Sequence, residues 1–382
     1  MALAEVIPTD EFAATMKPVR QASHAPGHIY SSPEIYAAEK ETIFLKDWLA
    51  VARVEELPEP GDFMTLRIVG EPIVLARDES GRLNAFANVC RHRGVEVASG
   101  SGNTREFSCP YHGWLYDLEG RLVGAPYMKD VEGFEPGNCR LDAVKLGIWR
   151  GWVFVNLDRD CEPLEDFVAD FEADFGFMRQ DRMKIFGKFE TTLNCNWKLV
   201  VENAMDKYHI NTIHRDTLSY KTAHMDVDYF YRKRGGYGTF FAMEPRTNSH
   251  RLMFGRNMPW LEDKPYNFAT ACFMAPNYQQ FYYADNVECL TYWPLGIDRT
   301  RLVVYMLLPA EWADIEGREE RMAEYLAQER QVFDEDREMV ESLQRAMASE
   351  LFEPGRMCHA EGPIHHQLKY YLERMFGAPN PG

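Results

Sequence analysis

The chain has 382 residues, with 42 Lys or Arg and 59 Asp or Glu, which gives a formal net charge of −17 at pH 7. This length exceeds the size at which one hydrophobic core usually stops growing, so we expect two domains. The acidic balance argues against nucleic acid or an anionic membrane surface as a partner, because both select a basic protein surface, but it leaves a basic protein partner open.

We expect no export signal in the N-terminal segment. It reads MALAEVIPTDEF, without the charged leader and long apolar core of a secretory peptide, and no later stretch approaches the roughly 20 apolar residues of a membrane span. We therefore expect a cytoplasmic protein whose eight cysteines stay reduced. A cysteine that recurs beside a histidine is then better explained as a metal ligand than as half of a disulfide.

The first 158 residues predict an arm, a helix and a β domain. Residues 1–29 are expected to be irregular, and SSPEIYAAEKETIFLKDW predicts a helix with Ser32 as its N-cap and Pro33 in its first turn. From residue 51 onward, short apolar or alternating runs are separated by turn signals such as DESG and LEG, the pattern of antiparallel strands. This β-rich block extends to about residue 158.

The remainder predicts a larger unit of sheet and helices, introduced by the linker DRDCEPLEDF. A strand over 184–192 leads into the helical segment NWKLVVENAMDKYH. Further strands are predicted near 227–242, 268–284, 288–295 and 301–308, followed by helices over 311–349 and in IHHQLKYYLERMF. The predicted fold class is α+β, with an N-terminal arm and helix (1–45), a small all-β domain (46–158) and a larger antiparallel-sheet-and-helix domain (159–382).

Two short motifs in the β domain, CRHRG and CPYHGW, place Cys90 two residues before His92 and Cys109 three residues before His112. Each motif offers one thiolate and one imidazole, the set that holds a [2Fe–2S] cluster when cysteine binds one iron and histidine the other. A Cys2His2 zinc site is the chemical alternative, but zinc fingers group cysteine with cysteine and histidine with histidine. Buried cysteines with surface histidines by chance are the second alternative.

The other cysteines occur singly, and we expect them to be small buried apolar residues: 139, 161, 195, 272, 289 and 358.

The segment ENAMDKYHINTIH carries His209 and His214 five residues apart. Residues 202, 206, 209 and 213 share one face of a helix, whereas five residues leave His214 about 140° out of phase with His209. Both imidazoles can meet one ion only if the helix ends, widens or bends between Ile210 and Ile213. Two histidines and one carboxylate on one face of Fe(II) leave open positions for O2 and substrate.

The third ligand is sought in RQVFDEDREMVESLQRAM. Asp336 is the one acidic residue on the predicted apolar stripe of this helix, and a buried carboxylate requires a metal or a partner. We predict it as the third ligand, with an ion pair to an inward Arg or Lys as the alternative. The stripe comprises Val332, Asp336, Met339, Val340, Leu343 and Met347, with Asp334, Glu338, Glu341 and Arg345 on the polar side.

From about residue 30 to its end, the chain resembles the catalytic (alpha) subunit of Rieske non-haem iron oxygenases, the aromatic ring-hydroxylating family. The resemblance implies that Cys90 and Cys109 hold one cluster iron and that His92 and His112 hold the other. It implies that His209, His214 and Asp336 bind Fe(II), and that Asn203 lines the iron pocket. It further implies that Asp206 bridges a cluster histidine to an iron-bound histidine across a subunit boundary. Glu202 receives no role.

The resemblance also implies an activity. A reductase or ferredoxin would supply electrons, and O2 would be used to mono- or dihydroxylate a small organic substrate. Family members that act on quaternary ammonium compounds usually carry Glu at the position of Asp206, so an aromatic substrate is favoured. Oxidative N- or O-dealkylation, including of quaternary ammonium compounds, is the alternative. The modest length favours a homotrimer without a β subunit. The aromatic-rich stretch 229–293 is expected to be mainly core.

Two other classes of protein remain open. A stand-alone Rieske-type electron carrier would bind no Fe(II) beyond its cluster. A zinc-binding interaction protein would be colourless and silent in electron paramagnetic resonance.

Overall fold

A computed structural model describes residues 9–215, 217–218, 228–242 and 253–377. The chain forms two compact units, one from Phe44 to Val168 and the other from the remaining residues. The domain limits at residues 46 and 158, predicted from the sequence, stay a prediction. Two parts of predicted elements lie outside the described residues, namely residues 1–8 of the arm and residue 227 of a strand. Within the described part, no helix combines the length and apolar character needed to cross a membrane.

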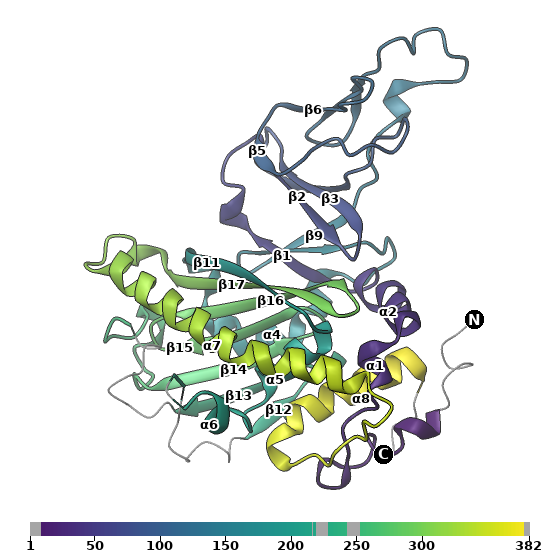
Figure 1. Ribbon diagram of the computed structural model, residues 1–382. Coiled ribbons are helices and arrows are strands. Elements are labelled where there is room, and N and C mark those ends of the chain that lie inside the picture. The colour runs from purple at the N-terminus through teal and green to yellow at the C-terminus, as the bar shows by residue number, and fades with distance from the viewer. Residues whose placement is uncertain (1–8, 216, 219–227, 243–252, 378–382) are drawn as a thin grey trace. The chain divides into compact units, whose positions relative to one another are not determined.

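The unit from Phe44 to Val168 consists mainly of strands (Figure 1). They form three antiparallel sheets, with strand orders β1-β10-β9, β4-β3-β2-β5 and β6-β7-β8. Its core contains both cysteines of the two Cys-His motifs, packed with Trp114, Tyr116 and Leu122. The bounds are β1 Leu49–Arg53, β2 Asp62–Ile68, β3 Glu71–Arg77, β4 Leu83–Ala87, β5 Ser101–Asn103, β6 Glu106–Ser108, β7 Leu115–Asp117, β8 Leu122–Gly124, β9 Lys145–Trp149, β10 Trp152–Asn156 and α3 Leu164–Phe167.

The second unit is built on a seven-stranded antiparallel sheet with the order β11-β17-β16-β15-β14-β13-β12. Strands β16 and β17 are buried along most of their length. The α+β fold class predicted from the sequence is confirmed. The bounds are β11 Met183–Leu193, β12 Tyr229–Tyr231, β13 Tyr237–Ala242, β14 Phe268–Met274, β15 Tyr278–Tyr283, β16 Val287–Gly296 and β17 Arg299–Pro309.

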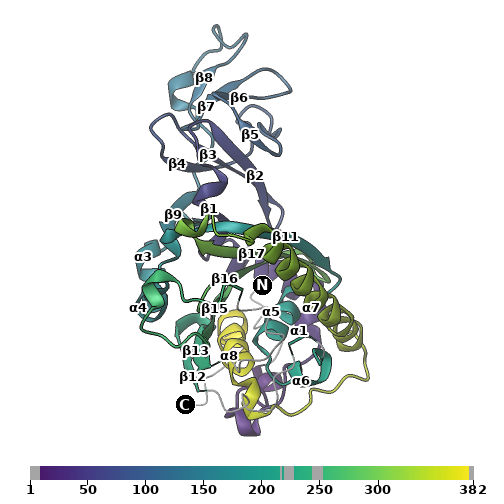
Figure 2. The ribbon, with the colours of Figure 1, turned by 90° about the vertical axis from the view of Figure 1, so that its left-hand side faces the viewer.

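Three helices carry or support the functional residues of this unit. Helix α5 contacts strands β16 and β17 and lies between α7 and α8 (Figure 2). The bounds are α1 His28–Ser31, α2 Pro33–Glu39, α4 Ala169–Phe175, α5 Trp197–Met205, α6 Ile210–Ile213, α7 Arg318–Met347 and α8 Gly362–Phe376.

Helix α2 begins as predicted but is shorter. The Ser32 hydroxyl accepts a hydrogen bond from the Ile35 amide at 3.2 Å, which confirms the N-cap. The α-helix ends at Glu39 and continues as a π-helical turn over Lys40–Phe44, so helical structure stops before Trp48, the last residue of the predicted stretch. Glu39, the last residue of α2, has a fully buried carboxylate that pairs with Lys198 and accepts hydrogen bonds from Trp197 and Tyr371.

Helix α7 buries a face that differs from the predicted stripe. Met339 and Leu343 are 38% and 42% exposed, so their predicted burial is wrong, whereas Asp336 and Gln344 are buried. Gln344 is tolerated there because its side chain accepts a hydrogen bond from the Asn196 amide and donates one to the Tyr30 carbonyl. The buried face is Met322, Tyr325, Glu329, Val332, Asp336, Val340, Gln344 and Met347.

Candidate metal centres and substrate cavity

The two Cys-His motifs form a matched pair of loops in the β unit. The Gly94 amide donates to the Cys90 carbonyl at 2.9 Å, and the Gly113 amide donates to the Cys109 carbonyl at 3.0 Å. Both glycines have positive φ, +81° and +69°, which lets each loop turn sharply after its histidine. Two loops of the same shape therefore present one thiol and one imidazole each.

The side chains in these loops are arranged as a [2Fe–2S] cluster of the Rieske type requires. Cys90 and Cys109 are buried, whereas His92 and His112 are exposed, and their two Nδ1 atoms lie 3.1 Å apart. The His92 ring stacks on Trp114 with centroids 4.9 Å apart. Two buried thiols behind two converging exposed imidazoles fit a cluster with one cysteine-bound and one histidine-bound iron.

Tyr116 is a residue of this site that the sequence did not indicate. It lies on β7, and its hydroxyl is 3.3 Å from the Cys90 sulfur while accepting a hydrogen bond from the Arg91 amide at 3.0 Å. Burial, with the neighbouring Cys90, raises the pKa of Tyr116 above its usual value, so the hydroxyl stays protonated. It can therefore donate a hydrogen bond to a cluster-bound sulfur.

In the segment ENAMDKYHINTIH, the helix ends earlier than predicted. Helix α5 ends at Met205, Asp206 is extended, and the single-turn helix α6 separates His209 from His214. The predicted break between Ile210 and Ile213 is therefore wrong, as is the predicted continuation of the helix to His209. The Asp206 carboxylate accepts a hydrogen bond from the Tyr208 amide at 2.6 Å, a local side-chain bond that competes with helix formation.

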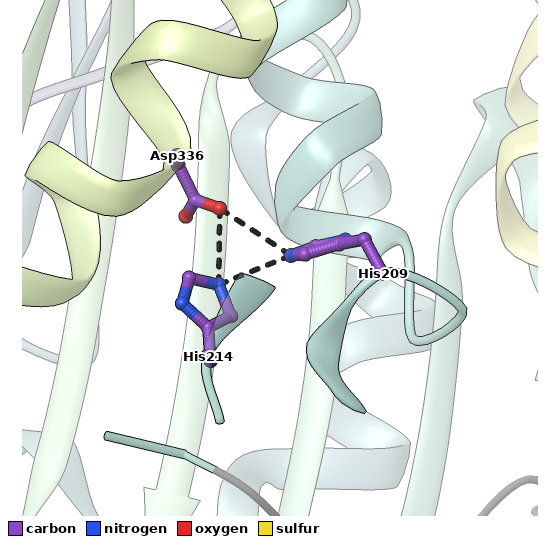
Figure 3. A group of neighbouring side chains, drawn as sticks. All are labelled: His209, His214 and Asp336. Carbon is purple, nitrogen blue, oxygen red and sulfur yellow. Dashed lines mark hydrogen bonds and ion pairs between the residues drawn. The ribbon is translucent and has the colours of Figure 1, made fainter. Parts of the chain in front are cut away.

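His209, His214 and Asp336 converge on one point (Figure 3). The two Nε2 atoms are 3.2 Å apart, and Oδ1 of Asp336 lies 3.4 Å from Nε2 of His209 and 3.0 Å from Nε2 of His214. Within the described residues this oxygen is buried yet makes no hydrogen bond of acceptable geometry. A buried oxygen and two imidazole nitrogens that converge in this way fit a divalent metal ion. Among the described residues, Asp336 forms ion pairs with His209 and His214 and not with the Arg or Lys of the alternative prediction.

The three side chains have strongly perturbed ionisation. Burial alone would lower the pKa of His209, but the carboxylates of Asp206 and Asp336 outweigh it and raise the pKa to about 9. Burial opposes ionisation of Asp336, yet the two imidazoles lower its pKa to about 2. In the metal-free protein the site therefore holds protons that a metal must displace.

Each candidate histidine ligand is oriented by a second carboxylate. Nδ1 of His209 lies 3.1 Å from Asp206, and Nδ1 of His214 lies 2.8 Å from Glu335, which also accepts a hydrogen bond from Thr217 at 2.6 Å. A carboxylate on the far nitrogen fixes the imidazole tautomer that leaves Nε2 free to bind metal. The sequence indicated Asp206 but not Glu335, whose position off the buried face of α7 gave no signal.

The two polar residues of α5 differ in their surroundings. Asn203 is half-buried and lines the cavity beside the candidate iron ligands, and its role in the iron pocket stays a prediction. Glu202 instead accepts hydrogen bonds from the Tyr30 hydroxyl at 2.9 and 3.1 Å, and burial raises its pKa to about 7. Its surroundings assign Glu202 to the packing of the N-terminal arm against α5.

A cavity of about 160 Å³ opens beside the three converging side chains. Strands of the seven-stranded sheet supply most of the aromatic residues in its wall. Part of the aromatic-rich stretch 229–293 therefore lines this cavity, although many of its side chains are also buried. The expectation that this stretch is mainly core is thus incomplete. The wall also contains charged side chains, namely Lys207, Glu288 and Glu329. The aromatic residues are Tyr237, Phe241, Phe281, Tyr283, Tyr292 and Phe333.

The remaining cysteines are free thiols within the described structure. Cys195, Cys272 and Cys289 are buried as expected, whereas Cys139, Cys161 and Cys358 are partly exposed, so full burial was wrong for these three.

Comparison with known proteins identifies two matched families. Residues 180–377 match the ring hydroxylating alpha subunit (catalytic domain), and residues 47–135 match the Rieske [2Fe-2S] domain. The carnitine monooxygenase oxygenase subunit of Acinetobacter baumannii is 36% identical over 194 residues, 50% of this chain and 52% of that protein. The anthranilate 1,2-dioxygenase large subunit of Acinetobacter baylyi is 34% identical over 199 residues, 50% of this chain and 42% of that protein.

A solved structure of a quaternary ammonium Rieske monooxygenase, described for carnitine oxidation and inter-subunit electron transfer, matches with a TM-score of 0.79 at 25% identity. This match covers 97% of the present chain and 99% of the other. By sequence, the chain spans about half the length of the curated relatives it matches.

Proposed function

The chain belongs to the family of ring-hydroxylating oxygenase alpha subunits, and from this premise we propose that it is the terminal oxygenase component of a Rieske non-haem iron oxygenase. It would use O2, with electrons from a partner reductase or ferredoxin linked to NAD(P)H, to hydroxylate a small organic substrate in the cytoplasm. The observation that carries this proposal is the convergence of His209, His214 and Asp336 at the wall of a cavity lined by aromatic rings.

When bound, Fe(II) would supply open positions for O2 and the [2Fe–2S] cluster would supply electrons. The protein's own side chains would hold the iron, orient its ligands and position the substrate. His209, His214 and Asp336 would hold the iron, and Asp206 and Glu335 would keep both imidazoles in the ligating tautomer. The aromatic wall would orient the substrate and exclude water from the reacting atoms.

Asp206 is also proposed to link the two metal centres. Its carboxylate contacts His209 on one side and remains partly exposed, and the neighbouring Tyr208 is 61% exposed. An exposed edge here supports the expectation that a cluster histidine from another protomer meets Asp206 in a homotrimer. The inter-subunit electron transfer described for the quaternary ammonium monooxygenase is consistent with this arrangement.

Two substrate classes follow from different observations. Asp206, where quaternary ammonium enzymes of the family usually carry Glu, favours hydroxylation of an aromatic compound. Oxidative N-dealkylation of a quaternary ammonium compound is the second candidate. It is favoured by the combination of aromatic rings with the buried carboxylates Glu288 and Glu329 in the cavity wall, since rings and carboxylates both attract a quaternary cation.

The test is oxygenation by the reconstituted protein. The protein is loaded with cluster and Fe(II), coupled to a surrogate reductase, and given candidate aromatic and quaternary ammonium substrates under ¹⁸O2. Product masses separate the addition of two oxygen atoms, the addition of one, and the loss of an alkyl group as an aldehyde. Labelled product supports the proposal, and an iron-loaded protein that incorporates no label into any substrate contradicts it.

A further inference from the structure

Lys207 lines the cavity, and its ammonium lies over two aromatic rings. Its Nζ lies 4.7 Å from the ring centroid of Phe241, which also lines the cavity, and 5.2 Å from that of Tyr229. Among the residues that the structure describes, no ion pair joins the Lys207 ammonium to a carboxylate. The ammonium group is therefore held by two aromatic faces and offers its hydrogens to the cavity.

The two rings do not replace the water that the ammonium loses. A partly desolvated cation over an aromatic face recovers part of its hydration energy, but an ammonium has three N–H donors that rings satisfy poorly. A carboxylate is the complementary partner for such a compact cation, because it offers the opposite charge and several acceptor positions. A carboxylate brought in by a ligand would complete the surroundings of Lys207.

We propose, on the basis of the function proposed above, that Lys207 binds a carboxylate of the substrate and selects substrates that are organic acids. Lys207 and the three converging side chains line the same cavity of about 160 Å³. A compact acid can therefore reach from Lys207 to the point where the metal ligands converge, and the oxidised atom would lie near the carboxylate.

Asp206 and Asp336 also line the cavity, but their carboxylates contact His209, and the other two acidic side chains lie on different elements. Glu288, on β16, accepts a hydrogen bond from the Tyr325 hydroxyl at 3.0 Å, and Glu329 lies one turn beyond Tyr325 on α7. Phe241 is on β13, three strands from β16 in the sheet order, which corresponds to about 14 Å at the usual strand spacing. The anionic group of a substrate would therefore bind at the β13 end, and a positive group would be accommodated at the β16 end.

The test measures binding without turnover. Holoprotein containing cluster and Fe(II) is titrated anaerobically by calorimetry with two matched pairs, glycine betaine against choline and benzoate against benzamide. Each pair keeps the rest of the molecule similar and changes a carboxylate into an uncharged group. The variants are Lys207→Met, which keeps an apolar side chain, and Lys207→Arg, which keeps the charge. Lys188→Met is the control, because it removes an exposed ammonium that lies 4.6 Å from the Tyr305 ring.

We expect the unmodified protein and Lys207→Arg to prefer the acid in at least one pair, and Lys207→Met to bind that acid roughly 30-fold more weakly or worse. Lys188→Met should bind like the unmodified protein. An acid preference that survives in Lys207→Met overturns the inference, as does an unmodified protein that binds neither acid. If Lys207 proves not to select acids but labelled product forms in the ¹⁸O2 assay, the proposed oxygenase function stands and only the role of Lys207 is overturned. If acids are preferred but no labelled product forms, the oxygenase function is overturned and the role of Lys207 in binding stands.

Discussion

Glu335 and His214 form the second of two carboxylate–histidine pairs behind the candidate iron ligands, with Oε2 of Glu335 lying 2.8 Å from Nδ1 of His214. Asp206 stands in the same relation to His209, at 3.1 Å. Glu335 immediately precedes Asp336, so one turn of α7 supplies both a candidate ligand and the residue that orients another. Each of the two imidazole rings is therefore held in its orientation by a different carboxylate.

Replacing Glu335 should weaken iron binding. In Glu335→Gln the amide can donate a hydrogen bond to Nδ1 of His214, which favours the tautomer whose proton is on Nε2 and hinders metal binding. We expect Fe(II) affinity to fall roughly 10- to 100-fold while cluster absorption is unchanged. Competition with a coloured chelator measures the affinity. Glu338→Gln, an exposed change on the same helix, is the control and should bind iron normally.

Iron binding should strengthen as the pH rises from 7 to 9. In the metal-free protein the pKa of His209 is raised to about 9 by Asp206 and Asp336, so the imidazole is protonated at neutral pH and must lose this proton to bind metal. The cost of deprotonation falls as the pH approaches 9, which predicts an affinity increase of about tenfold per pH unit for this proton. Chelator competition across this range measures it under anaerobic conditions, and an affinity independent of pH would contradict the assignment of His209 as a ligand.

Tyr116→Phe should lower the reduction potential of the cluster. The hydroxyl lies 3.3 Å from the Cys90 sulfur and, as a donor, stabilises the additional negative charge of the reduced cluster. The loss of about 1 kcal/mol of differential stabilisation corresponds to roughly 40 mV for a one-electron couple. A redox titration followed by electron paramagnetic resonance measures this shift. Tyr111→Phe removes an exposed hydroxyl 3.2 Å from Arg93 and should leave the potential near its original value.

The candidate metal ligands were predictable because their chemistry is carried by short segments. Cys90 and His92 lie in one tight loop, and His209 and His214 flank a single helical turn. Helical phase predicts that Asp336 is buried, and the structure agrees. Met339 and Leu343, which were placed on the same stripe, are exposed. Apolar character alone cannot fix the buried face of a helix when distant backbone groups, such as the Asn196 amide, can satisfy a polar residue like Gln344 there.

Residues that act through tertiary contacts were not predictable. Tyr116 reaches the Cys90 sulfur because β7 pairs with β6, with Tyr116 opposite Phe107, and no local pattern sets this register. The helix break also depends on a side chain. Asp206 was expected one turn before His209 on a continuous helix, yet its carboxylate binds the Tyr208 amide and ends the helical path. The contact between Asp206 and His209 survives because the turn brings them together instead.

Asp206→Asn should slow electron transfer between the two metal centres. A carboxylate can accept hydrogen bonds on both oxygens, so Asp206 can bind the Tyr208 amide and the Nδ1 proton of His209 and still offer an acceptor to a further imidazole. An asparagine has one acceptor oxygen, which cannot serve all three donors, so the link to a cluster histidine would be lost.

The Asp206→Asn change should weaken Fe(II) binding as in Glu335→Gln, so the variant is loaded with enough Fe(II) to saturate the site, as metal analysis verifies. With both metals bound, we expect the single-turnover rate of cluster oxidation by O2 in the presence of substrate to fall roughly 10- to 100-fold or more. Rapid mixing of the pre-reduced protein with O2, followed by the cluster absorption, measures this rate. Asp298→Asn, an exposed change in the turn between β16 and β17, should oxidise at the original rate. If Asp206→Asn transferred electrons as fast as the unmodified protein with both metals bound, Asp206 would have no bridging role.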